Sequence, residues 1–326
     1  MRIVFMGSSA ASAMCLKGIL REAQLQVVGV VTQPDRPAGR GRDLTPCPCK
    51  KYAVERGLKN FIAPDSVNSP EALAQIRAWK PDAIAVVAFG QFLKAELLSI
   101  PPKGCFNCHF SILPKYRGAT PVTAAIAAGD KVTGVSVIRM GIGMDDGDVL
   151  LSAIEPISLD DTGGTLMDRL AILGGVTLAK ALKMIAARQK IVEIPQVDEE
   201  ATFAHKLTKQ DGLINWSQSS VEIERRIRAF NPWPGSFTFL PARLRRKGQT
   251  GRLVVLGAVF TKITDEERAE LPGTVLRIDP AGPVVRTGNS ALTLVAVKPE
   301  GSRQMDGASF VNGRPLKPKV DMFVDR

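Results

Sequence analysis

Two runs of apolar residues with almost no polar alternation constrain this fold more than any other feature. They cover Ala83–Phe89 and Cys105–Phe110, and similar strand patterns occur at Arg2–Met6 and Val27–Thr32. A strand that faces water on one side alternates apolar and polar residues, whereas a strand of a parallel sheet is covered on both faces. Because helical patterns separate these runs, we predict a doubly wound α/β domain with a mainly parallel sheet.

The helices between these strands have recognisable ends. A turn of small residues at Gly7–Ala10 leads into a helix that continues to about Glu22. A second helix is predicted over Ser69–Trp79, with Ser69 as its cap. Thr162–Arg188 carries a long helical periodicity, and Thr133–Met140 is expected to continue the set of strands. By contrast, the Pro and Gly residues of 33–42 predict a loop.

The pattern changes after about residue 190. Residues 191–207 are polar and irregular, and they suggest a linker. Ser217–Phe230 follows as a predicted helix, in which Ser219 and Glu222 have the spacing of a capping box. Five short strands are then expected, at Ser236–Leu240, Arg252–Phe260, Gly273–Ile278, Pro283–Thr287 and Ala291–Lys298. Strands without long intervening helices predict a small OB-like β-barrel. We therefore divide the chain into a first domain (1–190), a linker (191–207) and a barrel domain (208–326).

The charge balance narrows the class of partner. The chain has 43 Lys and Arg against 32 Asp and Glu, a formal net charge of +11. This excess favours nucleic acid, polyglutamylated folates or anionic lipid, with a merely solvated basic surface as the alternative. No apolar run is long enough to cross a bilayer, and Met1–Phe5 has the character of a first strand rather than of a leader. We expect a cytoplasmic protein with no membrane partner.

The five cysteines do not suggest a disulfide framework in a chain of this length. Cys105 and Cys108 could combine with Cys47 and Cys49 as a zinc site. However, the first pair lies in an apolar strand pattern, and the second pair is spaced more tightly than zinc ligands usually are. We therefore expect no metal.

Polar side chains cluster where two of the expected strands end. Asn107 and His109 are two residues apart, so both point to the same face, at the carboxyl edge where α/β sheets bind ligands. The acidic turn Gly143–Asp148 follows another strand and could bring Asp145 or Asp146 to that edge. Each residue alone is more often structural. Together, an amide for an oxyanion, an imidazole for protons and a carboxylate to orient it suit acyl transfer. No obvious Ser or Cys nucleophile accompanies them, so the substrate itself would attack.

These residues belong to a wider pattern. The quoted motifs are Asn107-x-His109-x-Ser111-Ile112-Leu113-Pro114, Arg117–Ala119, Gly129-Asp130, Thr133–Val135 and Met144-Asp145-x-Gly147-Asp148. The pattern closely resembles the folate-dependent formyltransferases. The resemblance implies that Asn107 binds the formyl oxyanion, His109 manages protons and Asp145 pairs with His109, with Asp146 as the alternative carboxylate. The first turn, Ser8–Ala11, departs from the family's Thr-Pro-Asp/Glu-Phe, so the resemblance implies no substrate contact there.

Two further blocks resemble the branch of this family that acts on methionyl-tRNA. Thr32–Gly41 resembles its basic insertion loop, and Ile227–Pro234 resembles a helix exit in its C-terminal domain. The resemblance implies formyl transfer from 10-formyltetrahydrofolate, a reduced folate, to the amino group of initiator methionyl-tRNA by a monomer. The implied folate contacts are Phe89, Gly90, Gln91, Ser111, Leu113 and Pro114. The implied tRNA contacts are Arg36, Arg40 and Arg42.

Other functions fit less well. A nicotinamide dehydrogenase would carry Gly-x-Gly-x-x-Gly after its first strand, and Gly7–Ser12 does not supply it. Purine-pathway members of the resembled family lack a basic barrel. Members that formylate sugars add a dehydrogenase domain, and folate hydrolases add a regulatory domain before the first strand. A non-catalytic RNA-binding module remains the alternative from a different class.

Overall fold

The computed structural model describes residues 1–38 and 43–324, and the chain divides into two compact units. The first unit consists of Met1–Pro121, Lys131–Ile157 and Leu166–His205. The second unit consists of Val122–Asp130, Ser158–Thr165 and the chain from Lys206 onward. We describe each unit by itself. The predicted domain boundaries at 190 and 208 stay predictions.

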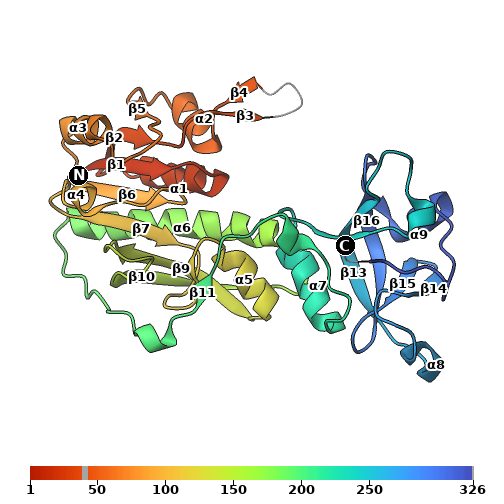
Figure 1. Cartoon of the computed structure of the whole chain (residues 1–326). Coiled ribbons are helices and arrows are strands. Elements are labelled where there is room, and N and C mark those ends of the chain that lie inside the picture. Colours follow the sequence, from red (N-terminus) through yellow and green to blue (C-terminus); the bar gives the residue numbers. More distant parts are fainter. Residues whose placement is uncertain (39–42, 325–326) are drawn as a thin grey trace. The chain divides into compact units, whose positions relative to one another are not determined.

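A seven-stranded sheet forms the centre of the first unit (Figure 1). Its order is β10-β9-β7-β6-β1-β2-β5. The strands are β1 (Arg2–Gly7), β2 (Gln26–Val31), β5 (Phe61–Ile62), β6 (Ala83–Val87), β7 (Cys105–His109), β9 (Val132–Arg139) and β10 (Val149–Pro156). The five neighbouring strands β7, β6, β1, β2 and β5 are parallel to one another. Three of them, β1, β6 and β7, are almost wholly buried. The predicted mainly parallel sheet is therefore confirmed.

Two features of the first unit differ from the sequence analysis. Strand β9 belongs to the sheet as expected but runs antiparallel to β7, and β10 adds a strand that no pattern predicted. A buried run such as that of β9 does not encode strand direction, and β10 is a half-exposed edge strand. The expected loop at 33–42 contains one short strand, β3 (Arg36–Ala38), which pairs as a hairpin with β4 (Asp43–Thr45) just after it. Residues 39–42 lie outside the described part of the chain.

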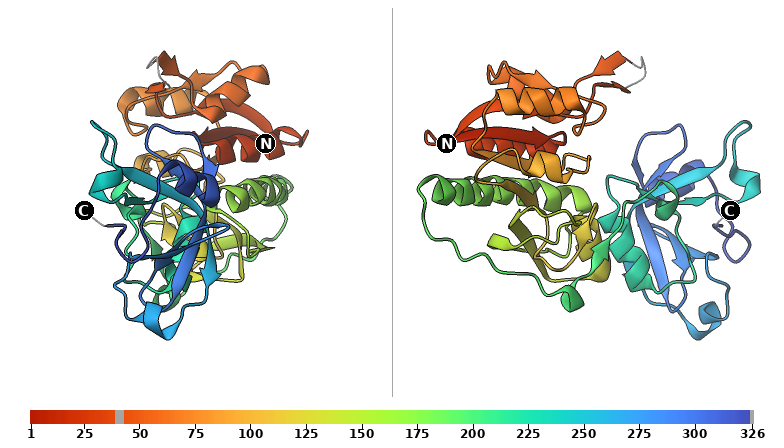
Figure 2. Two further views of the ribbon diagram at one scale, coloured as in Figure 1. Left: turned by 90° about the vertical axis from the view of Figure 1, so that its right-hand side faces the viewer. Right: turned by 60° about the vertical axis from the view of Figure 1, so that its left-hand side comes forward.

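Helices cover both faces of this sheet, as Figure 2 shows from two further directions. They are α1 (Ala10–Leu20), α2 (Pro48–Glu55), α3 (Pro70–Ala78), α4 (Ala95–Leu98) and α6 (Gly163–Ala186). Leu73 of α3 and Leu97 of α4 share a core with Cys105 of β7. Cys108, whose side chain points to the opposite face, lies beside Gly174 of α6. The caps follow the sequence, since Ser69 Oγ accepts from Ala72 N at 3.2 Å. Within the described residues, no helix is long and apolar enough to cross a membrane.

Residues 193–204, which we call the strap, run along the first unit and end at β11 (Phe203–Ala204). The strap is irregular, as the sequence suggests for a linker, yet it is bound along its length. Glu193 accepts two hydrogen bonds from Arg139, at 2.8 and 2.5 Å, and Ile194 bridges to Val149 through the backbone. Strand β11 pairs in parallel with β8 (Arg117–Gly118). The polar residues of this segment therefore hold it to the unit through hydrogen bonds.

The second unit is built on an antiparallel sheet with the order β12-β13-β16-β15-β14 (Figure 1). Its strands are β12 (Ser236–Phe239), β13 (Arg252–Thr261), β14 (Val275–Asp279), β15 (Gly282–Arg286), β16 (Ala291–Pro299) and β17 (Met305–Asp306). Val324 bridges to Phe239 beside β12, and Met322 bridges to Thr274 beside β14. The chain near its C-terminus thus links the two edges of the sheet, as the predicted small barrel requires.

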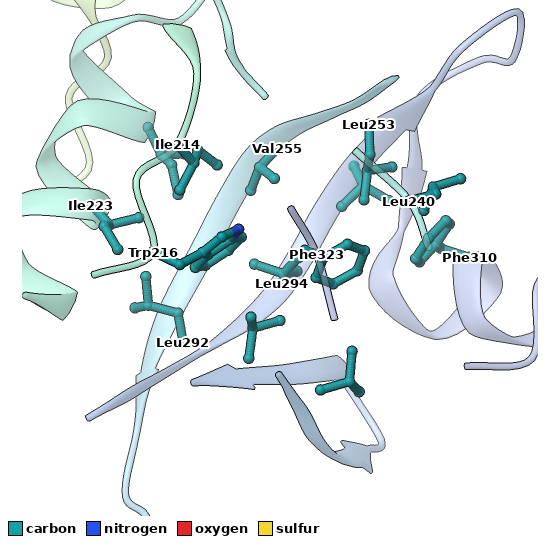
Figure 3. Close-up of a cluster of buried hydrophobic side chains, with 14 of the residues drawn as sticks. Ile214, Trp216, Ile223, Leu240, Leu253, Val255, Leu292, Leu294, Phe310 and Phe323 are labelled. Carbon is teal, nitrogen blue, oxygen red and sulfur yellow. The ribbon is translucent and has the colours of Figure 1, made fainter. Parts of the chain in front are cut away.

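Helices and one apolar core complete the second unit. The helices are α5 (Pro121–Ala128, all but its first residue), α7 (Ser220–Ala229), α8 (Asp265–Arg268) and α9 (Gly307–Gly313). The predicted capping box is present at α7, where Ser219 and Glu222 exchange hydrogen bonds. Figure 3 shows the core, in which Trp216 stacks on Phe323 with ring centroids 6.2 Å apart.

Candidate active site

Three side chains meet at the carboxyl edge of the first unit's sheet. Asn107 and His109 come from β7, and Asp145 comes from the turn between β9 and β10. Asn107 Nδ2 donates a hydrogen bond to Asp145 Oδ1 at 3.0 Å, and His109 Nδ1 lies 3.5 Å from Asp145 Oδ2. One carboxylate therefore lies between the amide and the imidazole, although Asp145 is 38 residues from Asn107 in the chain.

Each ring nitrogen of His109 faces an oxygen atom. Nε2 lies 2.8 Å from the carbonyl oxygen of Tyr116, and the side chain is only 6% exposed. Because a carbonyl oxygen only accepts, Nε2 carries the hydrogen of this bond, and Nδ1 faces Asp145. A separation of 3.5 Å is too long for a hydrogen bond, so the carboxylate acts on the ring through its charge in this structure.

The turn that carries Asp145 adopts an unusual backbone conformation. Asp145 has φ +51°, a left-handed value that Asp tolerates better than most residues. A Cβ added at Gly147 would lie 1.7 Å from Arg139 O, so this position accepts only glycine. The amide of Gly118 donates to Asp145 Oδ2 at 2.9 Å. Asp146 instead places its carboxylate against Gly143, so the structure brings Asp145, and not Asp146, to Asn107 and His109.

A cavity of about 400 Å³ opens beside the three side chains. Asn107, His109 and Asp145 line it together with largely apolar residues, which include Phe89, Leu93, Phe110, Met140, Met144 and Met167. Its size and its mixture of apolar walls with a few polar groups are typical of a site for a small organic ligand.

The six residues expected to contact folate fall into two groups, three that line the cavity and three that do not. Phe89, Gly90 and Gln91 line the cavity. The Gln91 side chain is itself engaged, since Oε1 accepts from Val67 N at 2.6 Å and Nε2 donates to Pro64 O at 3.1 Å. Any contact of Gln91 with a ligand therefore falls to its backbone, while its side chain holds the loop that contains residues 64–67.

Ser111, Leu113 and Pro114 lie in the next turn and are not among the residues that line this cavity. Ser111 Oγ donates to Lys115 O at 2.6 Å, and Leu113 N donates to Ser136 Oγ at 3.1 Å. These bonds shape the turn that presents the Tyr116 carbonyl to His109.

Several residues of the site carry little signal in the sequence. Gln196, in the strap, donates from Nε2 to the carbonyl oxygens of Asp145 and Gly147, each at 2.7 Å. No local pattern distinguishes it from its polar neighbours. Of the two methionines in the cavity wall, Met140 precedes the acidic turn in sequence and Met144 lies within it, and this position was their only signal in the sequence.

The side chains of the first turn and the cysteines contribute to the fold through caps, hydrogen bonds and burial. Ser9 caps α1, and Ser12 Oγ donates to Val87 O at 2.6 Å. Burial raises the pKa of Cys49 and of Cys105 to about 12, so both are neutral thiols near pH 7. A hydrogen bond with Cys108, and burial, raise the pKa of Cys15 as well. Within residues 1–38 and 43–324, no group of three or more His, Cys, Asp or Glu is placed to hold a metal ion.

Of the three arginines expected to contact tRNA, only Arg36 lies in the described part of the chain. Arg36 is exposed on β3, and Arg40 and Arg42 lie outside the described residues. In the second unit, Arg243 pairs with the buried carboxylate of Asp321, which gives this arginine a structural role. Other cations of that unit, Arg246, Lys247 and Lys262, are exposed.

Comparisons with known proteins extend over nearly the whole chain. The family described as Formyl transferase matches residues 1–182, and the one described as Formyl transferase, C-terminal domain, matches residues 206–315. The methionyl-tRNA formyltransferase of Marinobacter nauticus is 42% identical over 313 residues, which cover 96% of each chain. The enzyme of the same name from Symbiobacterium thermophilum is 42% identical over 314 residues, or 96% of this chain and 92% of the relative.

Solved structures share the fold at much lower identity. An N-formyltransferase from Helicobacter canadensis, solved with folinic acid and dTDP-3-aminofucose, has a TM-score of 0.59 and 16% identity. The alignment covers 93% of this chain and 99% of that one. HypX from Aquifex aeolicus, in complex with tetrahydrofolic acid, has a TM-score of 0.58 and 17% identity. This chain is covered completely in that alignment, but it spans only about half (51%) of HypX.

Proposed function

This chain belongs to the formyl transferase family, and we propose that it transfers the formyl group of 10-formyltetrahydrofolate to the amino group of initiator methionyl-tRNA. Its reaction is the formylation of methionyl-tRNA, the activity named for relatives that are about 40% identical over nearly their whole length. The observation that carries the mechanism is the bridge that Asp145 forms between Asn107 and His109 on the wall of the cavity.

In the proposed mechanism, the methionyl nitrogen attacks the formyl carbon, and the carbonyl oxygen becomes an oxyanion. Asn107 stabilises this oxyanion. Its amide carries two N–H donors, of which one binds Asp145 Oδ1, and the other donates to the oxyanion. Such a donor is fixed before the reaction, so it stabilises the developing charge without reorganisation.

Proton transfer completes the reaction. An α-amine titrates near pH ~8, so a neutral fraction is present before attack. After attack, the new C–N bond leaves a positive nitrogen that must lose a proton. The folate nitrogen must gain a proton as its bond to the formyl carbon breaks. We assign this transfer to His109, with the nearby Asp145 carboxylate stabilising the imidazolium.

The folate is proposed to enter the cavity beside the end of β6. Ala88 and Gly90 there have φ +41° and +82°, and these turns leave backbone groups of 88–91 along the cavity. A pteridine needs backbone hydrogen bonds and apolar walls, and both are present. Ser111, Leu113 and Pro114 support this site by shaping the neighbouring turn.

A substrate comparison tests the proposal. We expect the protein to formylate charged initiator tRNA with 10-formyltetrahydrofolate as donor, and to leave glycinamide ribonucleotide and dTDP-linked amino sugars unmodified. The measurement is incorporation of labelled formyl into each acceptor under the same conditions. Preferential formylation of either small acceptor would assign the chain to a different reaction of the same family.

The tRNA is proposed to bind through backbone phosphates, at a cytoplasmic, monomeric enzyme. The net charge of +11 and the exposed Arg36 support this. We expect the logarithm of tRNA affinity to fall linearly with the logarithm of salt concentration, and Arg36→Gln to reduce the slope by about 1. Filter binding over a salt series measures both.

A matched control is available for this series. Arg77 is also exposed but is paired with Glu96 at 2.7 Å, so Arg77→Gln should leave the slope unchanged. An affinity independent of salt, or equal slopes for the wild type and the Arg36 variant, contradicts the assignment.

A further inference from the structure

We propose that Gln196 is a positioning residue for Asp145, so that the strap belongs to the catalytic machinery rather than serving only as a connection. The inference rests on the proposed function, because it takes Asp145 as the carboxylate that serves Asn107 and His109. All the contacts that carry it lie within the first unit.

Gln196 joins the two sides of the acidic turn Gly143–Asp148. Its Nε2 donates to Asp145 O and to Gly147 O, each at 2.7 Å, so one NH₂ group ties two carbonyls across the turn. Its Oε1 accepts from Arg117 Nε at 3.0 Å. The three bonds determine how the amide is oriented, since a flipped amide would place its oxygen against two carbonyls and its NH₂ against a guanidinium.

The backbone conformation of the acidic turn requires interactions such as the two hydrogen bonds from Gln196. Asp145 is held at φ +51°, outside the ordinary range of residues with a side chain. Glycines at 143 and 147 flank it, and glycine leaves the backbone many alternatives. If Asp145 returned to an ordinary φ, its carboxylate would leave the position in which it reaches both Asn107 and His109.

The strap also holds Tyr116, whose carbonyl oxygen is hydrogen-bonded to His109. Thr202 Oγ1 accepts from Tyr116 N at 2.8 Å, and Tyr116 O is the acceptor beside His109 Nε2. Arg117, which follows Tyr116 and is buried, contacts the strap at two residues. It donates a hydrogen bond to Gln196 and forms an ion pair with Asp198 at 2.9 Å. Strap residues therefore contact the backbone on both sides of the catalytic pair.

The decisive variant is Gln196→Glu, which keeps the size of the side chain and an acceptor for Arg117 but removes the donor to the two carbonyls. Gln196→Ala removes both interactions. Gln189→Glu makes the same change of charge on an exposed side chain outside the strap and is the matched control.

We expect Gln196→Glu to lower kcat about a hundredfold, the scale of a small misplacement of a catalytic group. KM for either substrate should stay within about twofold, because the ligand contacts remain. Near pH ~4.3 the new carboxyl gains a proton and regains a donor, so activity relative to wild type should rise as the pH falls. Loss of packing alone would predict no such pH-dependent recovery.

A second measurement does not depend on activity. The chain contains only two histidines, so the ring resonances of His109 and His205 can be assigned by NMR. Displacement of Asp145 in Gln196→Glu should change the ring chemical shifts of His109, whose Nδ1 lies 3.5 Å from that carboxylate, and leave those of His205 in place. Unchanged ring chemical shifts of His109, or a kcat within about threefold of wild type, would overturn the proposal. A wild-type protein that does not formylate methionyl-tRNA would instead refute the proposed function, and the NMR result would still decide the role of Gln196.

Discussion

Replacement of His109 by alanine should lower kcat for the formylation of methionyl-tRNA about a hundred- to ten-thousandfold, the usual contribution of a positioned acid–base group. The imidazole lies between the Tyr116 carbonyl and the Asp145 carboxylate, and it lines the cavity in which the formyl group is expected. Without it, neither the proton leaving the new ammonium nor the proton arriving at the folate nitrogen has a carrier. Single-turnover formylation with saturating substrates measures this step directly.

The other histidine provides the control for this variant. His205 is exposed and offers only its backbone carbonyl, which accepts from Thr120 Oγ1 at 2.7 Å. His205→Ala should therefore retain wild-type kcat. Circular dichroism and thermal unfolding of both variants test for intact folds. Near-full activity of a folded His109→Ala protein would remove His109 from the mechanism.

Replacement of Asn107 by alanine should lower kcat about a hundred- to a thousandfold, the typical cost of losing one oxyanion donor. The effect has two sources. The donor to the oxyanion disappears, and Asp145 Oδ1 loses the partner that holds it at 3.0 Å. KM for the folate should change less than kcat, because the donor acts mainly in the transition state.

A variant of the same shape distinguishes the loss of the Asn107 hydrogen-bond donor from the loss of side-chain volume. Asn107→Asp replaces the amide by a second carboxylate beside Asp145, and like charges at this distance repel. It should be at least as inactive as the alanine variant. Asn312→Ala, at an exposed position on α9, is the control and should be unaffected. An active Asn107→Asp protein would show that the amide donor is dispensable.

Much of the fold follows from local patterns. The caps at Ser69 and Ser219 act within one helical turn, and the buried runs of β6 and β7 reflect cover on both faces. Such signals depend on neighbours in sequence, so they can be interpreted before the fold is known. The placement of Asn107 and His109 on one face of a strand end is of the same kind.

Strand direction and the acidic turn are different. The residue pattern leaves Asp145 and Asp146 as alternatives, because both lie in one glycine-flanked turn, and only the resemblance to the formyltransferases favours Asp145. Their roles differ in the structure because Asp145 adopts φ +51°, which turns its carboxylate toward β7. The reversal of β9 likewise depends on pairing with β7, and its burial resembles that of a parallel strand.

By itself, the sequence determined the doubly wound sheet, the barrel strands and the Asn107–His109 pair, since periodicity and caps act over a few residues. The resemblance favoured Asp145, but only the tertiary structure shows that its carboxylate meets that pair, and only the structure reveals the bonds that Gln196 makes from the strap. Those outcomes depend on hydrogen bonds between segments about 27 to 86 residues apart in the chain. The residue types of a segment do not specify such partners, because polar side chains of one kind bind any suitable group that the fold brings within reach.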